Sequence, residues 1–283
     1  MYVVTGATGQ LGRLVVEGLL AKVPASEVAV VVRSAEKAAD LAERGVTVRV
    51  ADYSRPETLA GAFAAGDRVL LISGSEIGSR VPQHTAVVEA ARAAGVALLA
   101  YTSAPGVATF RLADEHKATE AVIRESGLPF ALLRNGWYTE NYLGDAAGTA
   151  ERGAVVGSAG EGDRIATAPR RDYADAAVAV LTGEGHENAV YELSGDVAWS
   201  LPELAAELAL ASGKPVAFHR VAPDEHLRIL VGAGLPEGFA QILVDVDAGI
   251  ARGELAGTPG DLARLIGRPT VPLAQSVRAA LGA

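Results

Sequence analysis

A run of glycines near the start of the chain restricts the fold more than any other feature. Gly6, Gly9 and Gly12 stand three residues apart, after the apolar residues 2–5 and before leucines and valines at helical spacing. In a strand–turn–helix unit, such glycines permit a tight turn, close approach of the backbone to a pyrophosphate, and close packing of helix on strand. The free N–H groups at the helix start then bind the anion. The run therefore predicts a βαβ unit that binds a dinucleotide.

The glycine turn is the first of several similar units. Short apolar runs alternate with helical patterns up to about residue 134, which is typical of repeated βαβ units and a parallel sheet. Most runs are apolar throughout, as expected for strands that helices cover on both faces. Six strands are predicted, at residues 2–5, 28–32, 46–50, 69–72, 96–101 and 130–133.

Helix ends have local signals of their own. Ser54 has a glutamate three residues further on, a capping pattern that predicts a third helix starting near Ser54. Further helices are expected at residues 172–181 and from Ser200, which has the same pattern. Four glycines precede predicted strands, where a left-handed residue that ends a helix belongs; they are Gly45, Gly66, Gly95 and Gly127.

The regular alternation stops after Arg134. We interpret residues 1–134 as a dinucleotide-binding domain and residues 135–283 as mainly a substrate-side portion. A strand near residues 190–194 is expected to return to the main sheet as its seventh member. The predicted fold class is α/β, a doubly wound, Rossmann-like parallel sheet with a smaller α/β C-terminal substrate portion.

Charge and composition exclude several classes of function. The formal charge of −9 and the lack of a basic run disfavour nucleic acids and anionic membranes as partners. The absence of cysteine excludes thiol nucleophiles and zinc–thiolate sites, and the five histidines show no metal-ligand spacing, so no metal is predicted. The apolar runs are too short for a membrane helix or a signal peptide. We expect a cytoplasmic protein, either a monomer or a homodimer.

The residue after the second strand indicates which dinucleotide is used. An Asp or Glu there would accept hydrogen bonds from the adenosine ribose of NAD. The chain instead has Arg33, whose guanidinium can pair with a 2′-phosphate, and Lys37 follows one turn later. NADPH is therefore favoured over NADH. The alternative is that Arg33 is only a solvated surface charge.

Small polar residues follow the fourth and fifth strands. Ser73-Gly74-Ser75 and Thr102-Ser103 fall at the carboxyl edge of the sheet, where ligands bind in such folds. We expect them to border the nicotinamide ribose and ring. Asp52, after the third strand, could meet the adenine amino group or cap a helix, and both alternatives remain open.

These residues together resemble the NmrA-like family of atypical short-chain dehydrogenases/reductases, and within it the bacterial NAD(P)H:quinone oxidoreductase 2 group. The resemblance lies in segments spread over nearly the whole chain, at residues 4–12, 24–26, 51–53, 82–84, 132–138 and 265–267. It implies a quinone acceptor. It also implies NADPH binding by Gly6, Ala7, Thr8, Gly9, Gln10, Leu11, Arg33, Ser73, Gly74, Ser75, Trp137, Tyr138 and Asn141.

The chain departs from the wider superfamily at one pair of positions. Most members carry a Tyr-x-x-x-Lys pair that protonates a carbonyl during reduction. With Glu120 as the anchor, these two places hold Leu112 and His116. Neither can act as the tyrosine acid, so ordinary ketone reduction is not expected. A quinone needs less, because its reduced anion is stabilised and can take a proton from water.

Three residues are therefore the catalytic candidates: Tyr138 and Asn135 to orient the acceptor, and His116 to donate a proton near neutral pH. For His116 a purely structural role is the alternative. Trp137 and Tyr142 are predicted as flat walls of the site or as ordinary core residues.

The predicted function is transfer of a hydride from NADPH to a quinone or a similar conjugated acceptor. Two alternatives remain at this point. One is a non-catalytic NADP(H)-sensing regulatory protein of the NmrA type, which would also lack the Tyr-x-x-x-Lys pair. The other is a reductase of the triphenylmethane-dye type, which shares the same framework.

Overall fold

The computed structural model describes residues 1–106 and 113–282, and a seven-stranded parallel sheet forms its centre. The strand order is β3-β2-β1-β4-β5-β6-β8, so the chain winds outward in both directions from β1. This is the predicted doubly wound sheet. The strands are β1 (Tyr2–Thr5), β2 (Val28–Val32), β3 (Thr47–Val50), β4 (Arg68–Leu71), β5 (Leu98–Ser103), β6 (Phe130–Asn135) and β8 (Ala189–Leu193).

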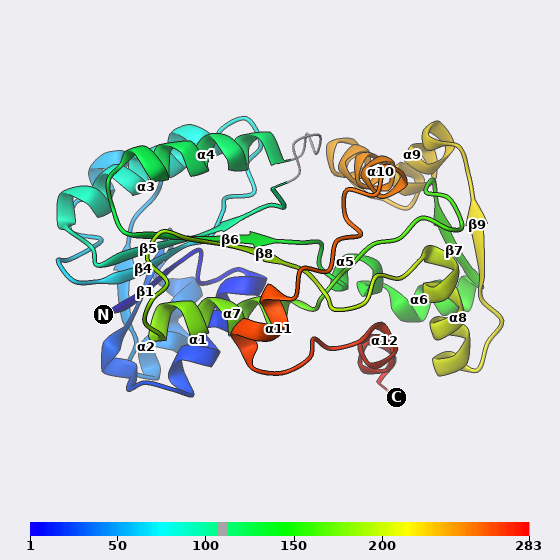
Figure 1. Cartoon of the computed structure of the whole chain (residues 1–283), viewed down its shortest axis with the longest axis horizontal. Helices are drawn as coiled ribbons and strands as arrows, with labels where there is room; N and C mark the ends of the chain where they lie inside the picture. The colour runs from blue at the N-terminus through cyan, green and yellow to red at the C-terminus, as the bar shows by residue number, and fades with distance from the viewer. Residues whose placement is uncertain (107–112, 283) are drawn as a thin grey trace.

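Helices cover both faces of this sheet (Figure 1). Alternate strand residues point to opposite faces, so Val4 packs in the core beneath α1 and α7, whereas Val3 packs in the core beneath α3 and α4. This explains why the strands are apolar at nearly every position. One face carries α1 (Gln10–Leu20), α2 (Ala39–Glu43), α7 (Arg170–Thr182) and α11 (Asp261–Ile266), and the other carries α3 (Arg80–Ala94) and α4 (Asp114–Glu125).

A smaller α/β part lies beyond the carboxyl end of the sheet (Figure 1). Its two strands, β7 (Ala154–Gly157) and β9 (Ala217–Arg220), pair in parallel, and a third core that includes Trp199 and Leu208 holds it together. Its helices are α5 (Glu140–Leu143), α6 (Ala146–Arg152), α8 (Leu201–Ser212), α9 (Pro223–Gly232), α10 (Glu237–Ala251) and α12 (Leu273–Leu281). The predicted division at residue 134 stays a prediction. Three elements from the later part of the chain, α7, β8 and α11, belong to the main sheet and the helices that cover it.

One predicted helix is wrong. No α-helix starts near Ser54, and the segment forms only a short 3₁₀ turn at Pro56–Leu59. The side chain of Asp52 accepts the N–H of Ser54 at 2.9 Å, which closes a local turn instead of leaving Ser54 to cap a helix. By contrast, Ser200 caps α8 with Glu203 as predicted, in a complete capping box.

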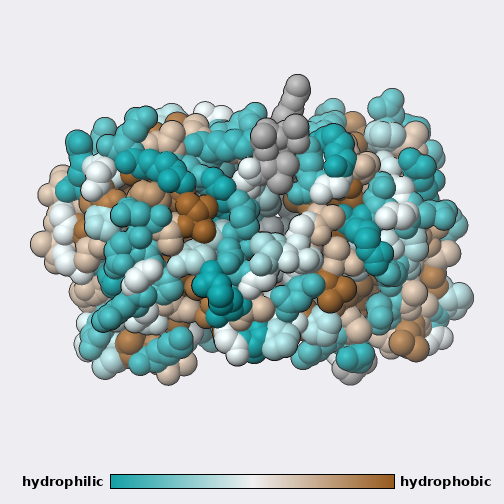
Figure 2. All heavy atoms as spheres, viewed as in Figure 1, coloured by the Kyte–Doolittle hydropathy of each residue, from teal (hydrophilic) through white to brown (hydrophobic). Residues whose placement is uncertain are grey.

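The surface carries little continuous apolar area on the face shown in Figure 2, where hydrophobic residues are scattered among hydrophilic ones. Scattered exposed apolar residues of this kind are normal for a globular surface. Among the described residues, no helix combines the length and apolar character that spanning a membrane requires.

Candidate functional site

The predicted site residues meet along the carboxyl edge of the sheet. Arg33 follows β2, the glycine turn follows β1, Ser73 follows β4, and Asn135 ends β6. These strands are consecutive neighbours together with β5, so the residues form a row across roughly four inter-strand spacings of ~4.8 Å. An extended dinucleotide fits such a row, with its adenosine end at β2 and its nicotinamide end near β6.

The glycine turn has the geometry that a phosphate site requires. Gly6 has a φ of 59°, which favours glycine, and the N–H of Gly9 donates to its carbonyl oxygen at 3.0 Å. A Cβ on Gly12 would lie 2.3 Å from the carbonyl oxygen of Gly6. No side chain caps the start of α1, so its first N–H groups are left for an anion.

Arg33 lies at the β2 end of the row, where the adenosine end is expected, and has a partner there. Its side chain is 74% exposed, and its guanidinium lies 3.2 Å from a carboxylate oxygen of Glu76 in the segment after β4. Gln83 donates to the other oxygen of Glu76 at 2.8 Å. An exposed ion pair of this kind contributes at most about 1 kcal/mol, so a bound phosphate can displace Glu76 from Arg33.

Asp52 turns inward on its own loop. Its side chain accepts from Ser54 and lies 3.7 Å from Arg55, and the structure thus favours the local capping role over a contact with adenine. This role was one of the two left open by the sequence, although the cap belongs to a turn and not to a helix.

The two polar residues that the sequence placed after the fifth strand are the last residues of β5, and both are hydrogen-bonded within the protein. Thr102 accepts the N–H of Ser73 at 2.9 Å, and the Ser103 hydroxyl donates to Glu120 at 2.6 Å. Ser103 therefore cannot offer the same proton to an acceptor while this bond stands. Both residues lie beside the row of site residues. Thr102 holds the backbone of Ser73 there, and Ser103 holds the Glu120 side chain.

Glu120 is the centre of a buried charged network. Arg134 on β6 binds both of its carboxylate oxygens, at 2.9 and 2.6 Å, and also donates to Glu192 on β8 at 2.8 Å. Burial opposes ionisation of Glu120, but the bonds from Arg134 and Ser103 outweigh it and hold its pKa below the usual value. The network ties α4 to β5, β6 and β8 at the edge of the site.

His116 occupies the place of the missing lysine, one turn before Glu120 on α4. Its Nδ1 lies 2.9 Å from the Tyr101 hydroxyl, and its Nε2 lies 3.3 Å from the Arg80 guanidinium. Since a guanidinium can only donate, Nε2 is the unprotonated nitrogen. Burial, helped by the charge of Arg80, lowers the pKa of His116 to about 3. A ring that is neutral at pH 7 does not favour the predicted role of proton donor.

The neighbouring His84 also has a lowered pKa, and together the two histidines predict how stability depends on pH. Burial lowers the pKa of His84 to about 4, whereas both histidines titrate near 6.5 in the unfolded chain. The unfolded state therefore binds more protons below about pH 6.5, and the folded state loses stability as the pH falls toward 4. We expect the free energy of unfolding to drop by roughly 2–2.5 kcal/mol per pH unit between about pH 6 and pH 4.5.

Urea unfolding at a series of pH values measures this slope. The variant His116→Gln keeps a polar group at the site but cannot titrate, and it should remove about half of the slope. A slope that is equal in the wild type and in this variant would contradict the prediction.

At the end of β6, the three predicted residues Asn135, Tyr138 and Asn141 lie close together around Arg170. The Arg170 guanidinium stacks 4.5 Å from the centre of the Tyr138 ring and donates to Asn141 at 2.9 Å. Asn135 donates weakly to the Tyr138 hydroxyl at 3.4 Å. Burial raises the pKa of Tyr138, so its hydroxyl keeps its proton. The orienting roles of Asn135 and Tyr138 stay predictions.

Asn135 has an unused acceptor. Its side-chain oxygen is buried and makes no hydrogen bond, and the buried hydroxyl of Tyr173 is likewise without a partner. Buried polar atoms normally have partners, so an orphan atom at a predicted site is a candidate ligand contact. Trp137 and Tyr142 pack against the third core, with Tyr142 edge-on to Trp199 at 5.2 Å.

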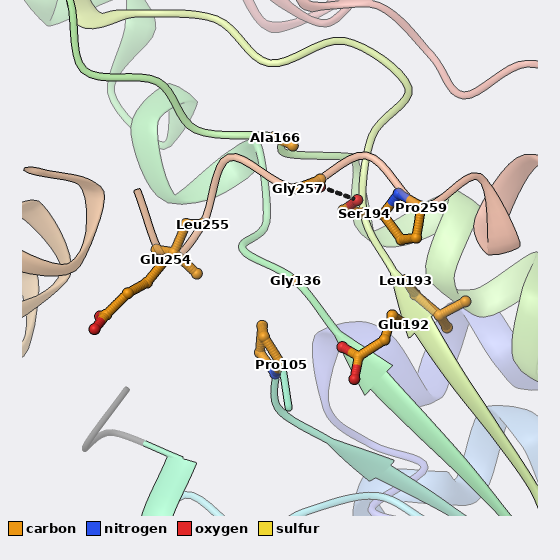
Figure 3. Close-up of a pocket in the computed structure, with 10 residues that line it drawn as sticks. All are labelled: Pro105, Gly136, Ala166, Glu192, Leu193, Ser194, Glu254, Leu255, Gly257 and Pro259. Carbon is orange, nitrogen blue, oxygen red and sulfur yellow. Dashed lines mark hydrogen bonds between the residues drawn. The ribbon is translucent and has the colours of Figure 1, made fainter. Parts of the chain in front are cut away.

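A cavity of about 230 Å³ opens beyond the ends of β5, β6 and β8 (Figure 3). Pro105 and Gly136 form one side of its wall, and Ser194 and Leu255 belong to the other. The wall is mainly apolar. Glu192 contributes a carboxylate that already binds Arg134, whereas the Glu254 carboxylate points away from the other lining residues.

The sequence missed several of these residues for a common reason. Arg80 and His84 lie on a helix behind the site, and the cavity wall combines β8 with a segment near residue 255. No local pattern marks such contacts between distant segments. Leu112, the other departure from the superfamily pair, lies outside the described residues. Within those residues, no group of three or more His, Asp and Glu is placed to hold a metal ion.

Comparison with known proteins identifies relatives along the whole chain. The model of a family described as NAD(P)H-binding matches residues 6–184. The chain is 48% identical over 279 residues to quinone oxidoreductase 2 of Escherichia coli strain K12, a match that covers 98% of this chain and 97% of that protein.

Two solved structures agree with this match. The NADPH-dependent quinone oxidoreductase of Escherichia coli, complexed with NADPH, has a TM-score of 0.95 at 47% identity and covers 99% of this chain and 100% of its own. The triphenylmethane reductase of Citrobacter sp., complexed with NADP(H), has a TM-score of 0.95 at 43% identity, with coverage of 99% and 100%.

Proposed function

Since this chain belongs to the NmrA-like family of NAD(P)H-binding proteins, we propose that it is an NADPH-dependent quinone oxidoreductase. The observation that carries the proposal is that the glycine turn, Arg33 and an apolar cavity lie along one edge of the sheet. Quinone oxidoreductase 2 of Escherichia coli, at 48% identity, and its crystal structure with NADPH support both the acceptor class and the cofactor.

The residues present fit NADPH. The uncapped start of α1 would hold the pyrophosphate, and the Gly12 position has no room for a side chain there. Arg33 would hold the 2′-phosphate after its bond to Glu76 is broken. The unpaired side-chain oxygen of Asn135 would accept a hydrogen bond at the nicotinamide end. Bound NADPH supplies the hydride for the reaction.

The cavity beyond Pro105 and Gly136 is the proposed acceptor pocket. Its volume suits a flat one- or two-ring quinone, and its apolar wall would orient the ring face. Ser103 donates to Glu120, and the neighbouring His116 ring is neutral at pH 7. The chain's contribution is therefore binding and orientation, and water supplies the proton to the reduced quinone.

The cofactor preference has a direct test in Arg33. Arg33→Ala should weaken NADPH binding by roughly 1.5–3 kcal/mol, about tenfold or more, and leave NADH nearly unaffected, because only NADPH carries the 2′-phosphate. Fluorescence titration with both dinucleotides measures the two constants. As a matched variant, Glu76→Gln removes the competing carboxylate and should strengthen NADPH binding by up to a fewfold. An equal effect of Arg33→Ala on both dinucleotides would exclude a 2′-phosphate contact.

The activity itself is tested by NADPH oxidation with a panel of benzoquinones, naphthoquinones and cationic triphenylmethane dyes. Turnover with quinones and little or none with dyes is expected. Failure with every acceptor, together with tight NADPH binding, would favour the sensor alternative. A preference for the dyes would favour the dye-reductase alternative.

The cytoplasmic location and the monomeric or homodimeric state are part of the same proposal, and light scattering tests the oligomeric state.

A further inference from the structure

The loop after β4 is held from behind by two side chains of α3. The N–H of Gly74 donates to His84 Nε2 at 2.9 Å, and the carbonyl oxygen of Gly74 accepts from Arg80 Nε at 2.7 Å. His84 is fully buried, and the side chain of Arg80 is 12% exposed. Both polar groups of one backbone residue are thus fixed by one helix. We call His84 and Arg80 the Gly74 clamp.

The bond to Gly74 determines the tautomer of His84. A backbone N–H can only donate, so Nε2 must carry no proton, and Nδ1 must carry it. Nδ1 indeed has an acceptor, the hydroxyl of Thr119 at 3.0 Å, and that hydroxyl donates onward to the carbonyl oxygen of Glu115 at 2.9 Å. The hydrogen bonds therefore run in one direction from Gly74 to α4.

Several charged and titratable groups surround His84, and among them Arg80 opposes its protonation. Arg80 lies on the same helix, and His116 and Glu115 face it from α4, with Glu115 3.4 Å from Arg80. Tyr101 on β5 packs edge-on against the His84 ring at 5.4 Å. Burial first, and then the charge of Arg80, lower the pKa of His84 to about 4. The ring is thus an acceptor over the whole neutral range.

Gly74 is the last of three consecutive residues with committed N–H groups. The N–H of Ile72 donates to Thr5 at 3.1 Å, and the N–H of Ser73 donates to Thr102 at 2.9 Å. Ile72 also backs the glycine turn, since a Cβ on Gly6 would lie 3.4 Å from its Cβ. The protein's own side chains therefore hold the backbone of this loop, directly beside the phosphate-binding turn.

We propose that His84 and Arg80 are positioning residues for NADPH, which fix the Gly74 peptide so that the loop at residues 73–75 is ready for the cofactor. This inference rests on the proposed function, because it assigns both residues a task in cofactor binding. A loop ordered in advance loses less conformational entropy when the ligand binds, so affinity is higher. Neither residue needs to touch NADPH.

The test compares two variants of His84. His84→Leu removes the acceptor for Gly74 and should raise the Kd for NADPH about tenfold. His84→Gln places a side-chain oxygen near the position of Nε2 and should restore the Kd to within about twofold of wild type. NADPH fluorescence titration without any acceptor gives the Kd, and steady-state assays should show an unchanged KM for the quinone.

Thr85→Ala is the matched control, because the Thr85 hydroxyl lies on the same helix and donates only to the carbonyl of Val81 at 2.9 Å. Its Kd should equal that of wild type. Equal Kd values for His84→Leu and wild type, or equal losses in the leucine and glutamine variants, would overturn the proposal. If His84→Leu does not fold, Arg80→Met removes the other half of the clamp, and an unchanged Kd there has the same meaning.

The outcomes separate this inference from the proposed function. A wild-type protein that binds NADPH but reduces no quinone contradicts the function, while the His84 series still decides the inference. A wild-type protein that reduces quinones and shows no difference in the series contradicts only the inference. Absence of NADPH binding overturns both.

Discussion

Gly12→Ala is expected to abolish NADPH binding at ordinary concentrations, a loss of roughly a hundredfold or more. The added Cβ would lie 2.3 Å from the Gly6 carbonyl oxygen and 2.7 Å from the Ala7 Cα. These are backbone atoms, so neither can turn aside as a side chain would. The start of α1 must move away from the turn, and the N–H groups that bind phosphate move with it. Fluorescence titration with NADPH measures the loss.

The same helix offers a matched control in Gly18→Ala. That Cβ would lie 2.9 Å from a terminal methyl of Val178, a buried side chain on α7, so α1 and α7 must part slightly while the phosphate turn keeps its backbone. The helix gains about 0.5–1 kcal/mol from replacing an interior glycine, which offsets part of the crowding. NADPH binding should remain normal. Comparable losses in both variants would mean that Gly12 acts through general stability and not through the phosphate turn.

The second large effect concerns the ion pair between Glu120 and Arg134. Arg134→Met should lower the free energy of unfolding by about 3 kcal/mol, because it leaves the nearly buried Glu120 carboxylate with the Ser103 hydroxyl and without its cation. The guanidinium also binds Glu192, so β6 and β8 lose a link at the edge of the acceptor cavity. Urea unfolding at pH 7 measures the change.

A double-mutant cycle distinguishes a lost pair from lost packing. Glu120→Leu combined with Arg134→Met should cost clearly less than the sum of the two single changes, since no charge is left alone. The pair of Arg44 and Glu17 is the exposed control, with side chains 46% and 52% accessible, and its removal should cost less than about 1 kcal/mol. Additive effects at Glu120 and Arg134 would contradict the assigned coupling.

Local patterns were sufficient for much of the fold. Each strand of the main sheet was predicted to within two residues at its ends, because runs covered on both faces are apolar throughout. Gly45, Gly95 and Gly127 all have positive φ values, as expected of residues that end helices. The Ser54 helix failed because the same capping pattern also suits a short turn, and Asp52 completes that turn with its side chain.

The site was predictable only along its edge. Arg33, Ser73 and Asn135 lie at or just after the ends of strands, so the strand order alone brings them into one row. The residues that hydrogen-bond to this row from the adjoining loop and helix could not be predicted. Glu76 opposite Arg33, and His84 behind Gly74, depend on how α3 packs on the sheet. No spacing in the sequence encodes that packing, and the neutral state of His116 depends on its burial and then on the charge of Arg80 from α3.

The cavity wall and the cofactor row come from different parts of the chain, so the two can evolve separately. The cofactor row is built by residues before 142, whereas Ser194, Leu255 and Gly257 contribute the far wall of the cavity from a much later part of the chain. Substitutions there would alter the shape of the proposed acceptor pocket and leave the phosphate turn and Arg33 untouched. Under the proposed function, point mutations in this wall would change the preferred acceptor while the electron donor stays the same.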